Sequence, residues 1–210
     1  MSEPVHELLN VYDDTGRVVG TRPRAEAKAA GLAVGAINVL LVNARGEVLL
    51  QRRPIDKENG GRWDKTVGGH VGAGEDFEAT AQRECGEELF DDPASPRVFV
   101  VPPPTLGVEC ARRDLTQCVV LASLARQLNL RDVRVGPDGG LRNVRYHVGI
   151  FAGRTDIAVT GFKPQASEID ELAYFAPDAV DRLLLRGGLA PNMAFLWLAH
   201  AHAALALASR

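Results

Sequence analysis

The chain has 210 residues, of which 46% are hydrophobic and 24% are charged, and its formal net charge is −3. Its length and composition are typical of one globular domain with a large core. The small negative charge excludes a basic field for bulk nucleic-acid binding, so a polyanionic substrate would have to be met locally, by a few arginines or by a metal ion.

The N-terminal region predicts a small β-hairpin. Residues 7–22 contain two strand-like runs, LLNVYD and RVVGTR, and an Asp-Thr-Gly triplet between them supplies the turn. A short helix or turn follows in PRAEAKAAGL and ends at Gly31. We expect residues 1–34 to form an N-terminal hairpin extension, without the basic and apolar regions of a signal peptide.

The next segment predicts two paired strands and then a helix. Residues 36–43, AINVLLVN, have the β-branched content of a buried strand, and residues 47–53, EVLLQRR, pair back with them across a turn. Residues 54–62 form a polar loop, and WDKTV leads from it into a glycine-rich turn. Residues 75–89 then have a helical pattern. One apolar face of this helix repeats every four residues and should pack on the core: Phe77, Ala81, Cys85 and Leu89.

The C-terminal half continues with mixed elements. After the strand RVFVV, residues 115–130 (LTQCVVLASLARQLNL) have apolar residues at helical spacing, which predicts a helix inside an insertion over residues 109–140. GPDGG predicts a turn, and VRYHVGIFAG predicts a long strand. A loop and strand within residues 167–176 precede two C-terminal helices, expected over residues 178–186 and 191–209.

These elements predict one α/β domain over residues 1–210, with a mixed β-sheet between helices, an N-terminal β-hairpin and C-terminal helices within residues 177–210. The three cysteines show no CxxC spacing, which argues against a disulfide framework or a zinc site and favours a reducing compartment. No stretch supplies the roughly 18 consecutive apolar residues of a membrane helix. We therefore expect a soluble, cytoplasmic protein.

Three carboxylates share one face of the helix predicted over residues 75–89. Because an α-helix turns about 100° per residue, Glu84, Glu87 and Glu88 lie within an arc of roughly 100°. Like charges at this spacing repel one another and do not stabilise a helix. A cluster of oxygen ligands on a rigid element suits Mg²⁺, and the glycine turn before the helix lets a ligand approach the backbone closely. The pattern indicates metal-assisted diphosphate chemistry.

The same residues resemble the Nudix box, the pattern of a glycine, five residues, a glutamate, seven residues and REUxEExGU, where U is a bulky aliphatic residue. All six fixed positions that carry the resemblance are present: Gly69, Glu75, Arg83, Glu84, Glu87 and Glu88. Cys85 stands in for an aliphatic residue. Phe90 and Asp91 depart from the pattern, where the family has glycine and an aliphatic residue. The pattern therefore does not predict how the chain leaves the C-terminal end of the helix. The resemblance implies the Nudix fold.

The surrounding sequence resembles the isopentenyl-diphosphate-isomerase-like branch of the superfamily, which holds isomerases and hydrolases. Three features oppose an isomerase. Gly68 stands at the position of the isomerase cysteine, residues 20–36 contain no histidine for its metal site, and LRNVRYHVGIFAGR lacks its catalytic acids. The resemblance therefore favours a hydrolase that cleaves a diphosphate linkage in a nucleoside diphosphate derivative or a similar organic pyrophosphate. An isomerase and a non-catalytic ligand sensor are the alternatives.

The resemblance also implies roles for residues of the box. Mg²⁺, with Mn²⁺ as a substitute, would be held by four ligands: Glu84, Glu87, Glu88 and the carbonyl of Gly68. Gly69, Glu75 and Arg83 would orient the loop and helix. The resemblance allows a homodimer, and the expected partner is a small-molecule diphosphate.

Residues outside the box complete the predicted site, and each has a structural alternative. Glu168, with Glu171 as second choice, would act as base or complete the metal site. Arg52 and Arg53 would hold a distal phosphate, or simply end a strand. Trp63 would be a structural anchor or stack on the substrate, and His70 would bond its own turn or contact substrate or metal. Cys85, within the box, is expected to fill the core.

Overall fold

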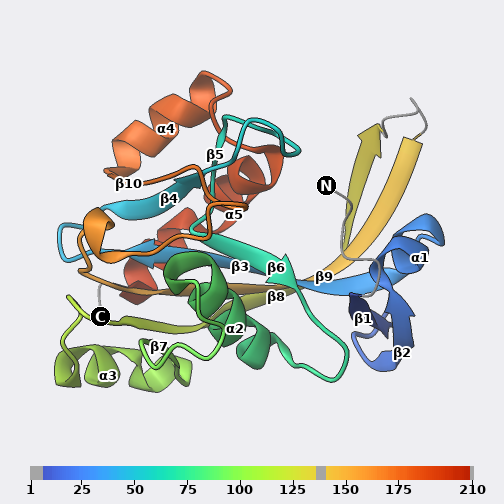
Figure 1. Ribbon diagram of the computed structural model, residues 1–210, viewed down its shortest axis with the longest axis horizontal. Coiled ribbons are helices and arrows are strands. Elements are labelled where there is room, and N and C mark those ends of the chain that lie inside the picture. Colours follow the sequence, from blue (N-terminus) through green and yellow to red (C-terminus); the bar gives the residue numbers. More distant parts are fainter. Residues whose placement is uncertain (1–6, 136–140, 209–210) are drawn as a thin grey trace.

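The computed structural model describes residues 7–135 and 141–208, with side chains described for residues 7–132 and 143–208. In chain order its elements are β1 (Leu8–Tyr12), β2 (Val18–Pro23), α1 (Arg24–Ala29), β3 (Ala33–Val42), β4 (Val48–Arg52), β5 (Trp63–Asp64), β6 (Val67–His70), α2 (Phe77–Phe90), β7 (Val98–Val100), α3 (Leu106–Arg112), β8 (Val119–Val135), β9 (Leu141–Arg154), β10 (Glu171–Phe175), α4 (Pro177–Leu185) and α5 (Pro191–Ala208) (Figure 1). Short 3-10 helices lie at Pro103–Thr105 and Val159–Gly161.

A mixed β-sheet forms the centre of the molecule. Its main path runs β10-β4-β3-β9-β8-β7, with β5 beside β4, β6 beside β3, and the β1–β2 hairpin attached to the start of β3. The pairs β3–β9 and β7–β8 are parallel, and the other pairs are antiparallel. Strands β4 and β6 share one edge of β3, and they diverge because β6 pairs with its first half and β4 with its last residues.

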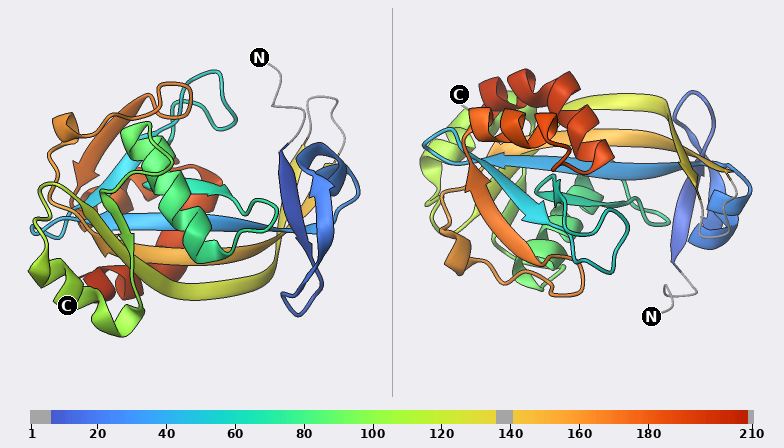
Figure 2. Two further views of the ribbon diagram at one scale, coloured as in Figure 1. Left: turned by 60° about the horizontal axis from the view of Figure 1, so that its bottom comes forward. Right: turned by 90° about the horizontal axis from the view of Figure 1, so that it is seen from above.

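Helices cover both faces of this sheet, as predicted. On one face, α2 packs the side chains of Phe77, Ala81, Cys85 and Leu89 into a core with β3, β6 and β9. On the other face, α4 and α5 pack onto β3, β4 and β9, and the α5 side chains of Met193, Leu196 and Trp197 lie at the centre of this second core. Figure 2 shows α4 and α5 on the side of the sheet opposite α2. The mixed-sheet α/β sandwich is confirmed, and Cys85 is a fully buried core residue.

Most predicted elements are present with boundaries shifted by a few residues. The N-terminal hairpin is β1–β2, and the short helix α1 ends before Gly31, which has a positive φ of 62°. The predicted long strand is β9, and the two C-terminal helices are α4 and α5. The turn expected at residues 136–140 lies outside the described residues. Among the described helices, none is long and apolar enough to cross a membrane.

One predicted element is wrong. Residues 115–130, expected to be helical, contribute most of β8, which pairs with β9 along its length. The first four residues of β8 are all buried, because Val119 and Leu121 face the α2 core while Val120 and Ala122 face a small core under α3. A strand buried on both faces loses its alternation of apolar and polar residues, and a continuous apolar run then mimics one face of a helix.

The segment expected to be an insertion, residues 109–140, is built into the sheet where the structure describes it. It contributes the end of α3 and strand β8, which lies between β9 and β7. Helix α3 was not predicted from the sequence. The division of the chain into a hairpin extension, an insertion and C-terminal helices stays a prediction.

Candidate functional site

The glycine strand β6 allows the carboxylate helix to approach the sheet closely. Strand β6 pairs antiparallel with β3, and Gly69 lies opposite Ile37 in this register. A Cβ atom at Gly69 would lie 2.1 Å from both Cδ and Oε1 of Glu84. No side chain can replace the hydrogen atom of Gly69 without moving the Glu84 carboxyl group. Gly69 and Glu84, two separated positions of the sequence pattern, are thus in direct contact in the folded chain.

The N-terminal hairpin fixes the loop between β6 and α2. The Asn10 side chain on β1 donates a hydrogen bond from Nδ2 to the Glu75 carbonyl oxygen at 2.9 Å and accepts one at Oδ1 from the Gly74 N–H at 3.1 Å. Helix α2 then begins with Asp76 as its N-cap, whose carboxylate accepts from the Ala79 N–H at 2.7 Å. Asn10 itself is 3% exposed, so the hairpin holds the loop through a buried side chain.

Arg83 connects Glu75 of the loop with two glutamates of α2. Its Nε and Nη2 bond the two carboxylate oxygens of Glu75 at 2.8 and 3.0 Å. Its Nη1 lies 3.0 Å from Glu84 Oε1 and 2.9 Å from Glu87 Oε2, and Nη2 also reaches the His70 carbonyl oxygen at 3.4 Å. The bond from Arg83 lowers the pKa of Glu75 below its usual range, so this carboxylate is ionised at neutral pH.

Glu84 and Glu88 are two carboxyl groups buried close to each other. Glu88 is 6% exposed, and its described hydrogen-bond partner is Gln51 Nε2 at 3.1 Å. Burial raises the pKa of Glu88 well above its usual range, the neighbouring Glu84 adds to the rise, and the Lys65 ammonium opposes it. Burial raises the pKa of Glu84 to about 7, against the effect of Arg83. Two buried carboxylates with this little compensation would be stabilised by a cation.

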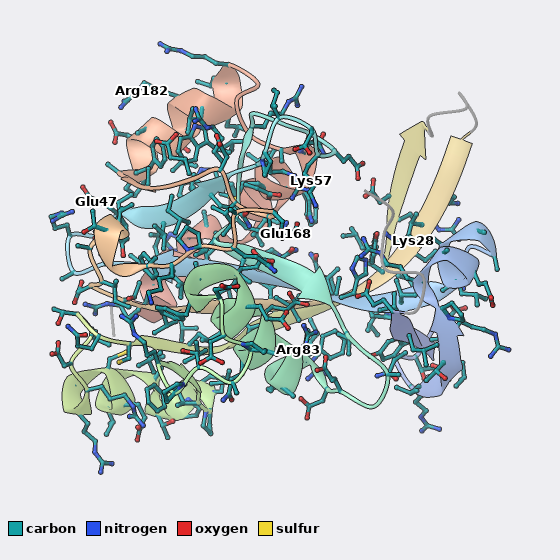
Figure 3. All side chains as sticks on the ribbon, viewed as in Figure 1. Lys28, Glu47, Lys57, Arg83, Glu168 and Arg182 are labelled. Carbon is teal, nitrogen blue, oxygen red and sulfur yellow. The ribbon has the colours of Figure 1, made fainter. Side chains whose placement is uncertain are left out.

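The segment that carries Glu168 is anchored to the end of α2. The N–H groups of Lys163 and Gln165 donate to the carbonyl oxygens of Leu89 and Glu88, at 2.9 and 3.2 Å. Glu168 lies near enough to Glu88 to raise the pKa of that carboxyl group, and its own carboxylate pairs with Lys57 Nζ at 2.9 Å. Figure 3 shows Lys57 and Glu168 beside each other. The structure therefore brings Glu168 to the carboxylate cluster.

The second candidate, Glu171, and the two arginines of β4 have other partners. The Arg52 guanidinium lies 2.9 Å from the carboxylates of both Asp170 and Glu171. Arg53 donates from Nε to the Glu58 carbonyl oxygen at 2.7 Å and from Nη1 to Asp64 at 3.3 Å. These contacts fit a strand end held by ion pairs, and the phosphate role of both arginines stays a prediction.

Trp63 and His70 point toward the face of the sheet that α4 and α5 cover. The Trp63 ring packs edge-on against Phe175, with centroids 4.7 Å apart, and belongs to the core on that face. The His70 ring lies 6.0 Å from the ring of Tyr146, which is part of the same core. The structure therefore places these two rings on the opposite face from the side chain of Glu84, and a contact with substrate stays a prediction for both.

The helix exit uses different residues from the family pattern. Asp91 has the left-handed φ of 53°, and its N–H donates to the Glu87 carbonyl oxygen at 3.0 Å. The next N–H, of Asp92, donates to the Gly86 carbonyl oxygen at 3.1 Å. A Cβ atom on Gly86 would lie 2.3 Å from the carbonyl oxygen of Asp92. Glycine at position 86 therefore makes this return possible, while Phe90 stays in the helix and contributes to the core.

Sequence analysis missed four residues that the structure places at the site: Asn10, Gln51, Asp64 and Lys65. The contacts of Asn10 and Gln51 join positions 65 and 37 residues apart, so no local pattern reveals them. Asp64 and Lys65 had a signal, because a charged pair stands only a few residues before the two glycines of β6. Both are buried in the structure.

The described residues form an α/β sandwich, and one of its helices carries a cluster of carboxylates linked by an arginine. A site of this class is suited to phosphate chemistry. The NUDIX domain model matches residues 32–101. The chain is 42% identical over 84 residues to the uncharacterized Nudix hydrolase PA4841 of Pseudomonas aeruginosa, and 40% identical over 85 residues to an isopentenyl-diphosphate Delta-isomerase of Halorhodospira halophila. Residues 32–101 therefore match a NUDIX domain, and the similar proteins include ones named as hydrolases and ones named as isomerases.

These relatives match only part of the chain. The two alignments each cover 40% of this chain, and the chain spans about half the length of the curated relatives it matches, 50% and 49%. A crystal structure of DR0079 from Deinococcus radiodurans covers 91% of this chain and 98% of that chain, with a TM-score of 0.62 and 19% identity. At that identity the likeness concerns the fold.

Proposed function

We propose that this protein hydrolyses a diphosphate linkage in a nucleoside diphosphate derivative or a similar organic pyrophosphate, with Mg²⁺ as its metal and Mn²⁺ as a substitute. The observation that carries the proposal is the pair of buried carboxyl groups of Glu84 and Glu88, held on one helix beside a glycine strand. Their burial is costly without a cation, so a structural role alone does not account for them.

The donor chemistry of the cluster fits a hard divalent cation. Glu84, Glu87 and Glu88 supply carboxylate oxygens, and the Gly68 carbonyl is the fourth candidate ligand. The described residues contain no ready group of three His, Cys, Asp or Glu side chains that could hold a metal ion. Arg83 binds both Glu84 and Glu87. Metal binding would therefore exchange part of this ion-pair network.

The residues of the chain have separate tasks in this reaction. Glu75 holds Arg83 at two points, and Arg83 fixes the loop and helix against each other. Glu168 would accept a proton from the attacking water, whose oxygen forms a bond to one phosphorus atom while the bridging oxygen leaves with the other phosphate. A metal ion bound by the carboxylates would neutralise diphosphate charge and lower the pKa of bound water.

Isomerisation of an allylic or homoallylic diphosphate is the second candidate, because the relatives include proteins named isopentenyl-diphosphate Delta-isomerase. Gly68 opposes it. It lacks a side chain that could act as a nucleophile, and a Cβ atom at this position would lie 2.1 Å from Lys65 Cε, so a larger residue would require the Lys65 side chain to move. The same diphosphate-binding cluster would serve either reaction, and only the products distinguish them.

The test is product analysis with a diphosphate panel: nucleoside di- and triphosphates, nucleotide sugars, ADP-ribose and isopentenyl diphosphate, each with and without Mg²⁺. Wild type is compared with Glu87→Gln and with the matched control Glu78→Gln, which removes a carboxylate from the same helix that pairs with Arg126. We expect metal-dependent release of phosphate or nucleotide that Glu87→Gln abolishes and Glu78→Gln retains. Tight binding of a panel compound without turnover would instead support a ligand sensor.

A further inference from the structure

Lys65 is a buried cation that has no role in the proposed reaction as described above. It follows β5 directly and is 7% exposed, with 9% of its side-chain surface accessible. A buried ammonium group is costly unless charges and hydrogen bonds compensate it, so lysines are rarely buried without a partner. Its two described hydrogen bonds from Nζ, at 3.2 and 3.3 Å, both go to the carboxylate of Asp64. An ammonium group has three donors, so this pairing leaves donor capacity.

Asp64 is shared between two cations. Its side chain is 4% exposed, and Oδ2 also accepts a bond from Arg53 Nη1 at 3.3 Å. The cluster of Arg53, Asp64 and Lys65 therefore carries one positive charge more than its single carboxylate neutralises. Excess buried charge of one sign is stabilised by charge of the opposite sign nearby.

That opposite charge lies in the carboxylate cluster. The Lys65 side chain packs against Gly68 of β6, since a Cβ atom there would be 2.1 Å from its Cε and 3.0 Å from its Nζ. Its partner Asp64 lies opposite Gln51 in the β4–β5 register, and Gln51 donates a hydrogen bond to Glu88. Strands β4 and β6 diverge along the edge of β3, and β5 with Asp64 pairs with β4 at this place. Lys65 is thus linked to the carboxylate cluster through Asp64 and Gln51.

We propose that Lys65 contacts a phosphate oxygen of the bound diphosphate, an inference that rests on the proposed function of the carboxylate cluster. With Glu88 holding a divalent cation, the Lys65 ammonium would be left to interact with an anionic substrate. Gly68 makes this position possible because its missing side chain leaves room for the alkyl chain of Lys65. The ion pair with Asp64 restricts the position of the ammonium group before substrate binds. This reduces the side-chain conformational entropy that is lost on binding.

The experiment measures binding of methylenediphosphonate, which has no hydrolysable bridge, by calorimetry in the presence of Mg²⁺. Lys65→Met is compared with wild type and with Lys28→Met, which removes the same charge on α1, far from the cluster (Figure 3). We expect Lys65→Met to weaken binding about tenfold or more, which corresponds to about 1.4 kcal/mol, and Lys28→Met to change it less than twofold. With a substrate found in the panel, KM should rise more than kcat falls.

Thermal unfolding checks that each variant is folded. If Lys65→Met does not fold, Lys65→Gln, whose amide can still donate to Asp64, is measured in the same way. Equal diphosphonate affinity in wild type and in the folded Lys65 variant would overturn the inference, whether or not turnover is observed. Diphosphonate binding that depends on Lys65 without turnover of any panel compound would uphold the inference for binding and count against hydrolysis.

Discussion

Arg83 and Glu75 form a two-point ion pair, with Nε–Oε1 at 2.8 Å and Nη2–Oε2 at 3.0 Å, although they belong to the helix and to the loop before it. The same guanidinium contacts Glu84 and Glu87. Because a planar guanidinium bonds a carboxylate in a fixed plane, Glu75 sets the orientation from which Arg83 meets the other two glutamates. The geometry of the carboxylate cluster thus depends on a residue that need not touch a metal ion.

The pH dependence of folding should reveal this pair. Because Arg83 lowers the pKa of Glu75, the folded state binds the Glu75 proton less tightly than the unfolded state does. Its contribution is therefore complete above the unfolded pKa of about 4.3 and is lost as pH falls through the lower folded pKa. We expect Glu75→Gln to reduce the free energy of unfolding by about 1 kcal/mol at pH 7 and by less at pH 3, measured by urea denaturation.

The control for this prediction is Glu78→Gln, which removes an exposed ion pair with Arg126 on the same helix. Its effect should stay within about 0.5 kcal/mol at both pH values, because exposed pairs contribute little. A loss for Glu75→Gln that is as large at pH 3 as at pH 7 would show that the effect is steric and does not come from the ion pair.

Gly69→Ala should disturb the cluster more than an alanine at another strand glycine does. The new Cβ would lie 2.1 Å from the carboxyl carbon of Glu84, so this side chain must move, at a cost of about 1–3 kcal/mol. Gly20→Ala in β2 is the matched control, because nothing lies within 4 Å of its Cβ position. Thermal unfolding and turnover of both variants check the prediction, which fails if Gly69→Ala retains wild-type stability and rate.

Asn10→Ala should loosen the loop before α2 without touching the carboxylates. It leaves the N–H of Gly74 and the carbonyl of Glu75 without their side-chain partner, which costs about 0.5–1.5 kcal/mol. We expect faster amide hydrogen exchange at Gly74, a lower melting temperature and a reduced rate of hydrolysis. Unchanged exchange at Gly74 would mean that the hairpin does not hold this loop in solution.

The sequence predicts the carboxylate helix and its glycine strand because their residues are local. Glu84, Glu87 and Glu88 are set on one face by helical periodicity alone, and the α/β sandwich follows from strands that alternate with helices. Strand β8 was mistaken for a helix because Val119 and the next three residues are buried on both faces of the sheet. Periodicity reports which side of an element is apolar, and it fails where both sides are.

The remaining parts of the site come from pairings that only the folded chain shows. Asn10 reaches the loop from the N-terminal hairpin, and Gln51 reaches Glu88 from β4. Glu168 was proposed from its sequence context, and the structure anchors its segment through backbone bonds to Leu89 and Glu88. Such contacts depend on strand register and loop path, which composition and spacing do not determine.

Hydrolysis in water enriched in ¹⁸O tests the central claim most directly. Wild type and Glu87→Gln are incubated with Mg²⁺ and the panel compounds, and the products are analysed by mass spectrometry. We predict that wild type places one ¹⁸O atom in one phosphate-containing product, and that Glu87→Gln slows this by about a hundredfold or more, which is about 2.7 kcal/mol of transition-state stabilisation. Conversion of isopentenyl diphosphate to its allylic isomer without ¹⁸O in phosphate, or no labelled product from any compound, would contradict the account.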